Sequence, residues 1–150
     1  MGKIFQTSED VLKKAEKAFH ETALETYGPT IRVMSVTKAK EIIKASRASE
    51  ATEFLTETQD VIQMFIYEAA FDMLDEETQM QLLEMALSVF SFDGDKGKIV
   101  IDNRPNAAIL NMCRKYGCEF VDKLELQNMV IQQVEEEEKA KKEAKKSGNE

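Results

Sequence analysis

The chain has one histidine, two cysteines and no hydrophobic run near the ~20 residues that a membrane-spanning helix needs. Zinc sites are built from several histidine or cysteine ligands, and Cys113 and Cys118 have no such cluster around them. We therefore expect no zinc site and two reduced cysteines, as in an intracellular protein. His20 is interpreted as a surface histidine near a helix end rather than as a metal ligand or proton shuttle.

Basic residues are also scarce, because 20 lysines and arginines face 28 acids and leave a formal net charge of −8. Nucleic-acid binders gain affinity when cations displace counterions, so this balance argues against direct nucleic-acid binding. The start of the chain lacks the apolar region of a signal peptide, and Gln6 stands where a myristoylation signal has serine or threonine. We expect a cytoplasmic protein without membrane contact.

Two common catalytic patterns are missing as well, the glycine-rich phosphate loop and Gly-x-Ser-x-Gly. The spacing of Asp93, Asp95 and Gly97 resembles part of a calcium loop. That loop needs an oxygen ligand at the place of Gly97, a glycine at the place of Lys98 and a closing glutamate at the place of Arg104. We therefore predict a turn here and no calcium site.

Alternating and β-branched segments predict strands. Residues 30–36 alternate, and residues 60–67 are apolar on both faces, which is typical of an internal strand. The glycines of residues 93–97 favour a tight turn between strands at 90–92 and 98–101. Together these segments predict a small mixed sheet.

Capping residues predict the helices. Ser8 can cap a first helix that Gly28 and Pro29 end, and Asp75 can cap a central helix that reaches Phe90. A further helix is predicted from Arg104 to Tyr116–Gly117, with Pro105 in its first turn. The stretch 37–58 is ambiguous between helix and extended structure, and its part 46–57 is interpreted as a loop.

The last part of the chain favours a separate helix. Apolar residues recur from Asp122 to Val134, and acids followed by lysines suit the two ends of a helix dipole. We expect fraying beyond Lys139, where nothing large and apolar remains. The expected organisation is an α+β domain over residues 1–121, its sheet packed against the first and central helices, and a C-terminal helix with a charged tail over 122–150.

The order strand, acid-capped helix, glycine-rich hairpin and helix ending in Tyr116–Gly117 resembles the putative phage metallopeptidase family, a zincin-like group of phages and prophages. In that family the central helix carries His-Glu-x-x-His, and a third histidine opens the helix that ends in Tyr-Gly. Aligned on the Asp-rich turn and on Tyr116–Gly117, those positions are Glu84, Met85, Ser88 and Arg104. The resemblance covers residues 30–120 and implies a zincin-like fold.

At these positions the chemistry of a zinc peptidase is missing. A catalytic zinc needs about three protein ligands and an open water position. Glu84 and Ser88 offer one carboxylate and one hydroxyl, Arg104 would repel the ion, and Met85 cannot act as a general base. We therefore expect a pseudoenzyme without cofactor or metal, in which Glu84 and Arg104 form an ion pair next to Ser88.

Three functions are compatible with the sequence. The first is a non-catalytic zincin-like domain of phage or prophage origin, in the host cytoplasm, that binds an unidentified protein partner. Its possible contacts are Glu135, Glu136, Glu137 and Glu138 on the C-terminal helix. The second is a metal-dependent hydrolase with an atypical site made from acids such as Glu84 and Glu68. The third is an acidic inhibitor of a host nucleic-acid enzyme.

Overall fold

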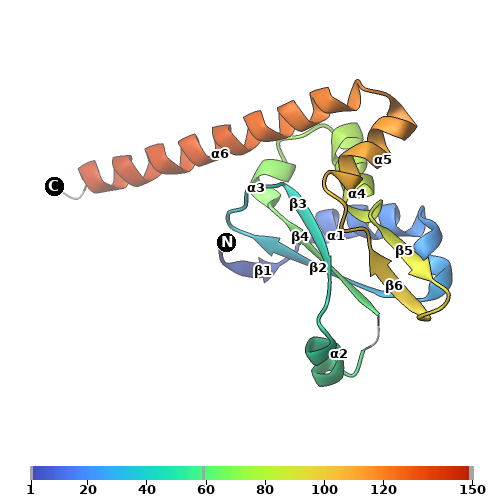
Figure 1. Cartoon of the computed structure of the whole chain (residues 1–150). Helices are drawn as coiled ribbons and strands as arrows, with labels where there is room; N and C mark the ends of the chain where they lie inside the picture. The colour runs from blue at the N-terminus through green and yellow to red at the C-terminus, as the bar shows by residue number, and fades with distance from the viewer. Residues whose placement is uncertain (1, 59, 149–150) are drawn as a thin grey trace.

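A computed structural model describes residues 2–58 and 60–148 and has an α+β fold (Figure 1). It contains a mixed four-stranded sheet, a separate hairpin and a long C-terminal helix. The elements follow in the order β1 (Ile4–Gln6), α1 (Glu9–His20), the 3₁₀ helix η1 (Ala23–Tyr27), β2 (Thr30–Val36), β3 (Ile43–Arg47), α2 (Glu50–Thr56), β4 (Val61–Ile66), α3 (Glu68–Phe71), α4 (Glu76–Leu87), β5 (Phe90–Asp93), β6 (Lys98–Ile101), α5 (Ala107–Tyr116) and α6 (Phe120–Gly148).

The large sheet has the strand order β1-β2-β4-β3. β2 and β4 run parallel, while β1 and β3 pair antiparallel on the two sides. The predicted strand 30–36 is confirmed, and β4 is internal as its apolar sequence predicted. Two strands were missed: β1 is only three residues long, and β3 lies in the ambiguous stretch.

The two faces of this sheet have different surroundings. Ile62, Met64 and Ile66 of β4 have no exposed surface and belong to the core cluster that α1 and α4 also enter. α1 and α4 pack against each other and contact β2 and β3, respectively. Side chains alternate along a strand, so Gln63 and Phe65 point to the opposite face, where both are half-buried.

The hairpin β5–β6 exists as predicted, but it is a separate two-stranded sheet and not part of the mixed sheet. A side chain links the two sheets: the carboxylate of Asp60 accepts the backbone N–H of Ile99 at 3.0 Å. The predicted loop 46–57 is also wrong in part, since it contains α2. Ser49 caps this helix by accepting the N–H of Thr52 at 3.1 Å.

The helix starts were predicted better than the ends. α1 and α4 begin directly after Ser8 and Asp75, and both side chains accept N-terminal N–H groups. α1 ends at His20, however, and η1 continues to Gly28, whose φ of 74° ends it. α5 begins at Ala107 rather than Arg104, because Asn106 has a left-handed φ of 60° that interrupts helical geometry.

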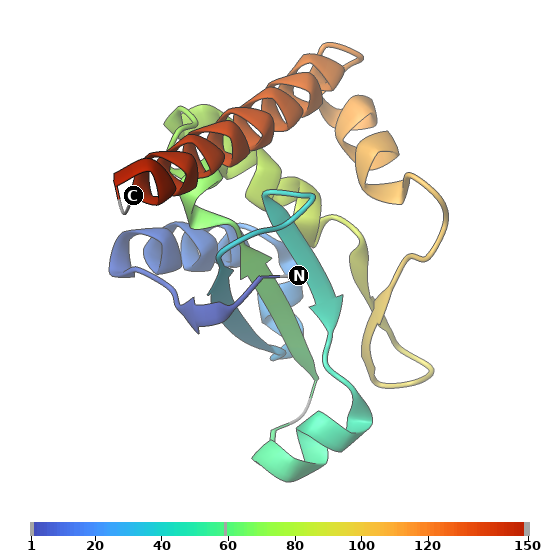
Figure 2. The ribbon, with the colours of Figure 1, turned by 90° about the vertical axis from the view of Figure 1, so that its left-hand side faces the viewer.

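α6 continues to Gly148 instead of fraying after Lys139. Val130, Ile131 and Val134 are buried against the core, and α6 contacts α3 and α5. It runs along the end of the molecule opposite α2 (Figures 1 and 2). Among the described residues, no helix has both the length and the hydrophobicity to cross a bilayer.

We expect Asp75→Ala to lower the free energy of unfolding by about 1 kcal/mol at neutral pH, because the cap of α4 is lost. The Thr78 hydroxyl donates to Asp75 at 2.6 Å and lowers the pKa of Asp75 below its ordinary 3.8. A lowered pKa means that this contribution is complete above 3.8 and is lost as the pH falls through the folded-state value.

Urea unfolding at about pH 7 and about pH 2.5 checks this, with Asp75→Asn as the control that keeps an acceptor. The difference between wild type and Asp75→Ala should shrink at the lower pH. An equal difference at both values would contradict the assignment of the cap to the ionised carboxylate.

Candidate functional site

An open groove of about 810 Å³ lies between the end of α1, η1, α4, β5 and the end of α5. We call it the Glu84 groove. Its rim carries Tyr27 and Phe92, whose rings stack with centroids 4.2 Å apart and an interplanar angle of 3°. The polar and apolar residues that line it include Ala18, Glu21, Thr22, Leu24, Tyr27, Glu77, Met80, Gln81, Glu84, Leu87, Ser88, Phe92, Lys115 and Tyr116.

Glu84 is the centre of a small polar cluster in this groove. One carboxylate oxygen pairs with the ammonium of Lys115, and the other accepts the Tyr116 hydroxyl at 2.5 Å. These hydrogen bonds raise the pKa of Lys115 and the pKa of Tyr116 above their ordinary values. At neutral pH the raised pKa values keep Lys115 a cation and Tyr116 a neutral phenol.

The four positions that the resemblance singled out do not converge. Glu84 and Ser88, one helical turn apart, both line the Glu84 groove. Met85 and Arg104 line a different hollow of about 400 Å³ beside β3. The next residue on a helix is turned by about 100°, which places Met85 on another side of α4 from Glu84.

The predicted ion pair between Glu84 and Arg104 is therefore wrong. Arg104 pairs with Asp102, two residues before it, at 2.7 Å. The carboxylate of Asp102 also accepts the backbone N–H of Arg104 at 3.0 Å. This local turn holds the guanidinium and lowers the pKa of Asp102. Ser88 does not join Glu84 either, because its hydroxyl donates to the backbone carbonyl of Met85 at 2.7 Å.

The residues that complete the groove were not predicted from the sequence. Lys115 and Tyr116 occur next to each other at the end of α5, where the sequence indicates only a helix end. Tyr27 and Gln81 were not predicted either. Gln81 is half-buried, and its carbonyl oxygen has no hydrogen-bond partner among the described residues. This oxygen is itself buried, so it is not an open acceptor for an incoming segment.

The acids of the alternative metal site have separate partners. Glu68 accepts the backbone N–H of Ser8 at 3.0 Å and its hydroxyl at 2.6 Å, whereas Glu84 is held by Lys115. Within residues 2–58 and 60–148, no three His, Cys, Asp or Glu side chains form a group able to hold a metal ion. His20 pairs with Glu25 at 2.6 Å and is mostly exposed, which confirms its interpretation as a surface residue.

The remaining predicted residues lie away from the groove. Cys113 is half-buried, Cys118 is exposed and both are free. Residues 135–138 are exposed on α6. Burial raises the pKa of Tyr67, directly after β4, and the charges of Glu138 and Glu135 raise it further. The role of residues 135–138 as partner contacts stays a prediction.

Comparisons with known proteins identify no relative for this arrangement. No protein-family model matches the chain, and no curated protein or solved structure is significantly similar to it. The groove is therefore interpreted from its own chemistry.

Proposed function

We propose that this chain is a non-catalytic, zincin-like domain of phage or prophage origin that acts by binding another protein, and that the Glu84 groove receives a segment of that partner. The succession β4, α4, hairpin and α5 supports the resemblance to phage metallopeptidases. One observation carries the proposal. At the position of the first zinc-binding histidine, Glu84 lies in an open groove and both its oxygens have partners.

The residues on α4 supply binding groups rather than hydrolytic ones. Glu84 is neutralised in part by Lys115, and the Ser88 hydroxyl is used within the helix end. Met85 has no group that could take a proton from water. Peptide hydrolysis at this place would also need an electrophile, and neither Met85 nor Ser88 supplies one.

The charge of the groove indicates what kind of segment it accepts. Its lining includes Glu21, Glu77 and Glu84 but a single lysine, Lys115. The Tyr27–Phe92 stack adds aromatic surface to this acidic lining. A partner segment that carries a lysine or arginine between apolar residues satisfies both features.

Affinity capture from host-cell extract, with the full chain as bait, tests this proposal. The groove variant carries Glu21→Lys and Glu77→Lys, both at exposed positions. We expect it to recover the partner at least about tenfold less well than wild type, because like charges now meet across the contact. The matched control carries Glu135→Lys and Glu136→Lys on α6, and it should recover the partner as wild type does.

Three outcomes would contradict parts of this proposal. Loss of the partner with the α6 variant alone would move the contact to residues 135–138 and leave the groove without this role. A melting temperature that rises with added zinc, together with zinc-dependent peptide hydrolysis, would show a metal enzyme instead. Capture of a nucleic-acid enzyme that falls steeply with salt would favour the acidic inhibitor.

A further inference from the structure

α2 exposes the two most exposed large apolar side chains among the described residues. Phe54 is 83% exposed and Leu55 is 79% exposed. Glu50 and Glu57 stand beside them, exposed at the two ends of the helix. We call these four residues the α2 knob. The helix projects beyond one end of the sheet, away from the rest of the molecule (Figures 1 and 2).

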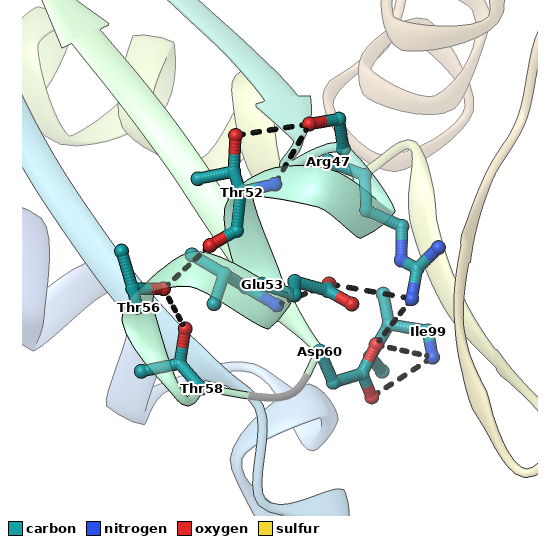
Figure 3. Close-up of polar contacts among 9 residues, drawn as sticks. Arg47, Thr52, Glu53, Thr56, Thr58, Asp60 and Ile99 are labelled. Carbon is teal, nitrogen blue, oxygen red and sulfur yellow. Dashed lines mark hydrogen bonds and ion pairs between the residues drawn. The ribbon is translucent and has the colours of Figure 1, made fainter.

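The apolar residues of α2 do not hold it in place. None of its seven described residues is buried, and a helix this short is not stable by itself. Polar contacts with the ends of β3 and β4 hold α2 in place (Figure 3). Glu53 accepts the backbone N–H of Val61 at 3.2 Å and lies 3.5 Å from the guanidinium of Arg47. The knob is thus rigidly placed while Phe54 and Leu55 face solvent.

Large exposed apolar side chains on a fixed projection are typical of contact surfaces. Once buried by a partner, each of the two side chains could contribute about a tenfold gain in affinity. The flanking acids restrict the partner to a surface that is apolar and positively charged. The Glu84 groove does not fit, since it is lined by three glutamates and one lysine.

The face of the mixed sheet opposite α1 and α4 is both apolar and positively charged, as a partner of the α2 knob must be. The strand register places side chains in two neighbouring rows across β2, β4 and β3. We call these six residues the sheet platform: Arg32, Gln63 and Ser46 in one row, and Met34, Phe65 and Lys44 in the next. Arg32 and Lys44 are exposed at opposite corners, and the half-buried Phe65 lies between Met34 and Lys44.

The platform and the knob match in charge and in size. The six platform residues, all described, include two cations and no acid, although the whole chain has a net charge of −8. Three strands span about 10 Å from the first to the third, which is about the diameter of one helix. Arg32 and Lys44 could then meet the acids at the two ends of α2.

We propose that the α2 knob of one copy of this chain docks on the sheet platform of a second copy. Phe54 and Leu55 cover Phe65 and Met34, and Glu50 and Glu57 pair with the two platform cations. A contact made by one short helix buries less surface area than a stable complex needs, so the association is weak and reversible. This contact does not involve the Glu84 groove. A result against self-association therefore leaves the proposed function unaffected.

Sedimentation velocity of the full chain over a concentration series up to about 1 mM tests this proposal, since weak contacts appear only in that range. We expect concentration-dependent association that weakens as salt is raised. Phe54→Ala with Leu55→Ala should weaken it at least about tenfold. The matched control is Leu126→Ala with Met129→Ala, two exposed residues of α6, which should associate as wild type does.

Charge reversal gives the decisive comparison. A knob variant with Glu50→Lys and Glu57→Lys, and a platform variant with Arg32→Glu and Lys44→Glu, should each lose self-association. Mixing the two variants should restore a heterodimer, because the reversed charges are complementary again. A chain that stays monomeric at all concentrations, or a mixture that fails to associate, would overturn the proposal. Binding of a single-stranded oligonucleotide to the platform of a monomeric chain would also overturn it.

Discussion

Phe71→Ala is expected to lower the free energy of unfolding by about 3–5 kcal/mol, the largest effect of a single substitution that we predict. The Phe71 side chain has no exposed surface and belongs to the core cluster of the sheet, α1 and α4. Its removal loses the transfer free energy of the ring and leaves a cavity that the surrounding helices fill only in part.

Urea unfolding followed by circular dichroism measures this loss, and Phe54→Ala is the matched control. Phe54 is 83% exposed, so the same change there should alter the free energy of unfolding by less than about 0.5 kcal/mol. If both variants lost equal stability, α2 would pack on the protein in solution and Phe54 would not be available to a partner.

Asp60→Ala is expected to lower the free energy of unfolding by about 3 kcal/mol, the second-largest effect. Figure 3 shows its carboxylate between Arg47 and the backbone of Ile99. It accepts the Ile99 N–H with both oxygens at 3.0 Å, and it lies 3.5 Å from the guanidinium of Arg47.

Three costs add up in this variant. The N–H of the fully buried Ile99 loses its acceptor. Arg47, whose side chain is 20% exposed, keeps only Glu53 as a charged partner among the described residues. Asp60 also has a left-handed φ of 55°, which alanine adopts less readily than aspartate. Arg47 is partly exposed and keeps its pair with Glu53, so the expected loss of stability is at the low end of the range for a broken buried ion pair.

Asp60→Asn separates these costs, because asparagine keeps an acceptor for Ile99 and tolerates the left-handed conformation. We expect it to lose about 1 kcal/mol, mainly through the weaker contact with Arg47. Amide hydrogen exchange at Ile99 should accelerate in Asp60→Ala and remain slow in Asp60→Asn. Equal exchange in both variants would show that Asp60 does not connect the hairpin with the mixed sheet.

Much of the local structure could be read from neighbouring residues. The caps at Ser8 and Asp75 and the internal strand 61–66 were all predicted close to their observed places. Each depends on side chains within about four positions, since a cap bonds to N–H groups two or three residues on and strand alternation is a local period. β3 was missed because the local pattern of residues 37–58 fits both helix and extended structure, and the pairing with β4 that decides between them joins residues far apart in the sequence.

The candidate site was predictable only in part. Glu84 and Ser88 share a groove because they are four positions apart on one helix, a relation that the sequence contains. The sequence does not indicate the partner of Glu84, because Lys115 lies 31 positions away on α5. The resemblance suggested Arg104 as the partner of Glu84, but Arg104 pairs with Asp102. A pair between residues two positions apart closes a much shorter loop and therefore costs less chain entropy.

By itself, the amino-acid sequence indicated the capped starts of α1 and α4, the strands β2 and β4, the hairpin, the scarcity of metal-binding side chains and the excess of acids. Tertiary structure alone decided that the hairpin stands apart from the sheet, that Glu84 is held by Lys115 and Tyr116, and that α2 exposes its apolar side chains at one end. The reason is physical. Local geometry depends on the nearest few residues, whereas contacts between distant segments depend on how all buried surfaces pack at once.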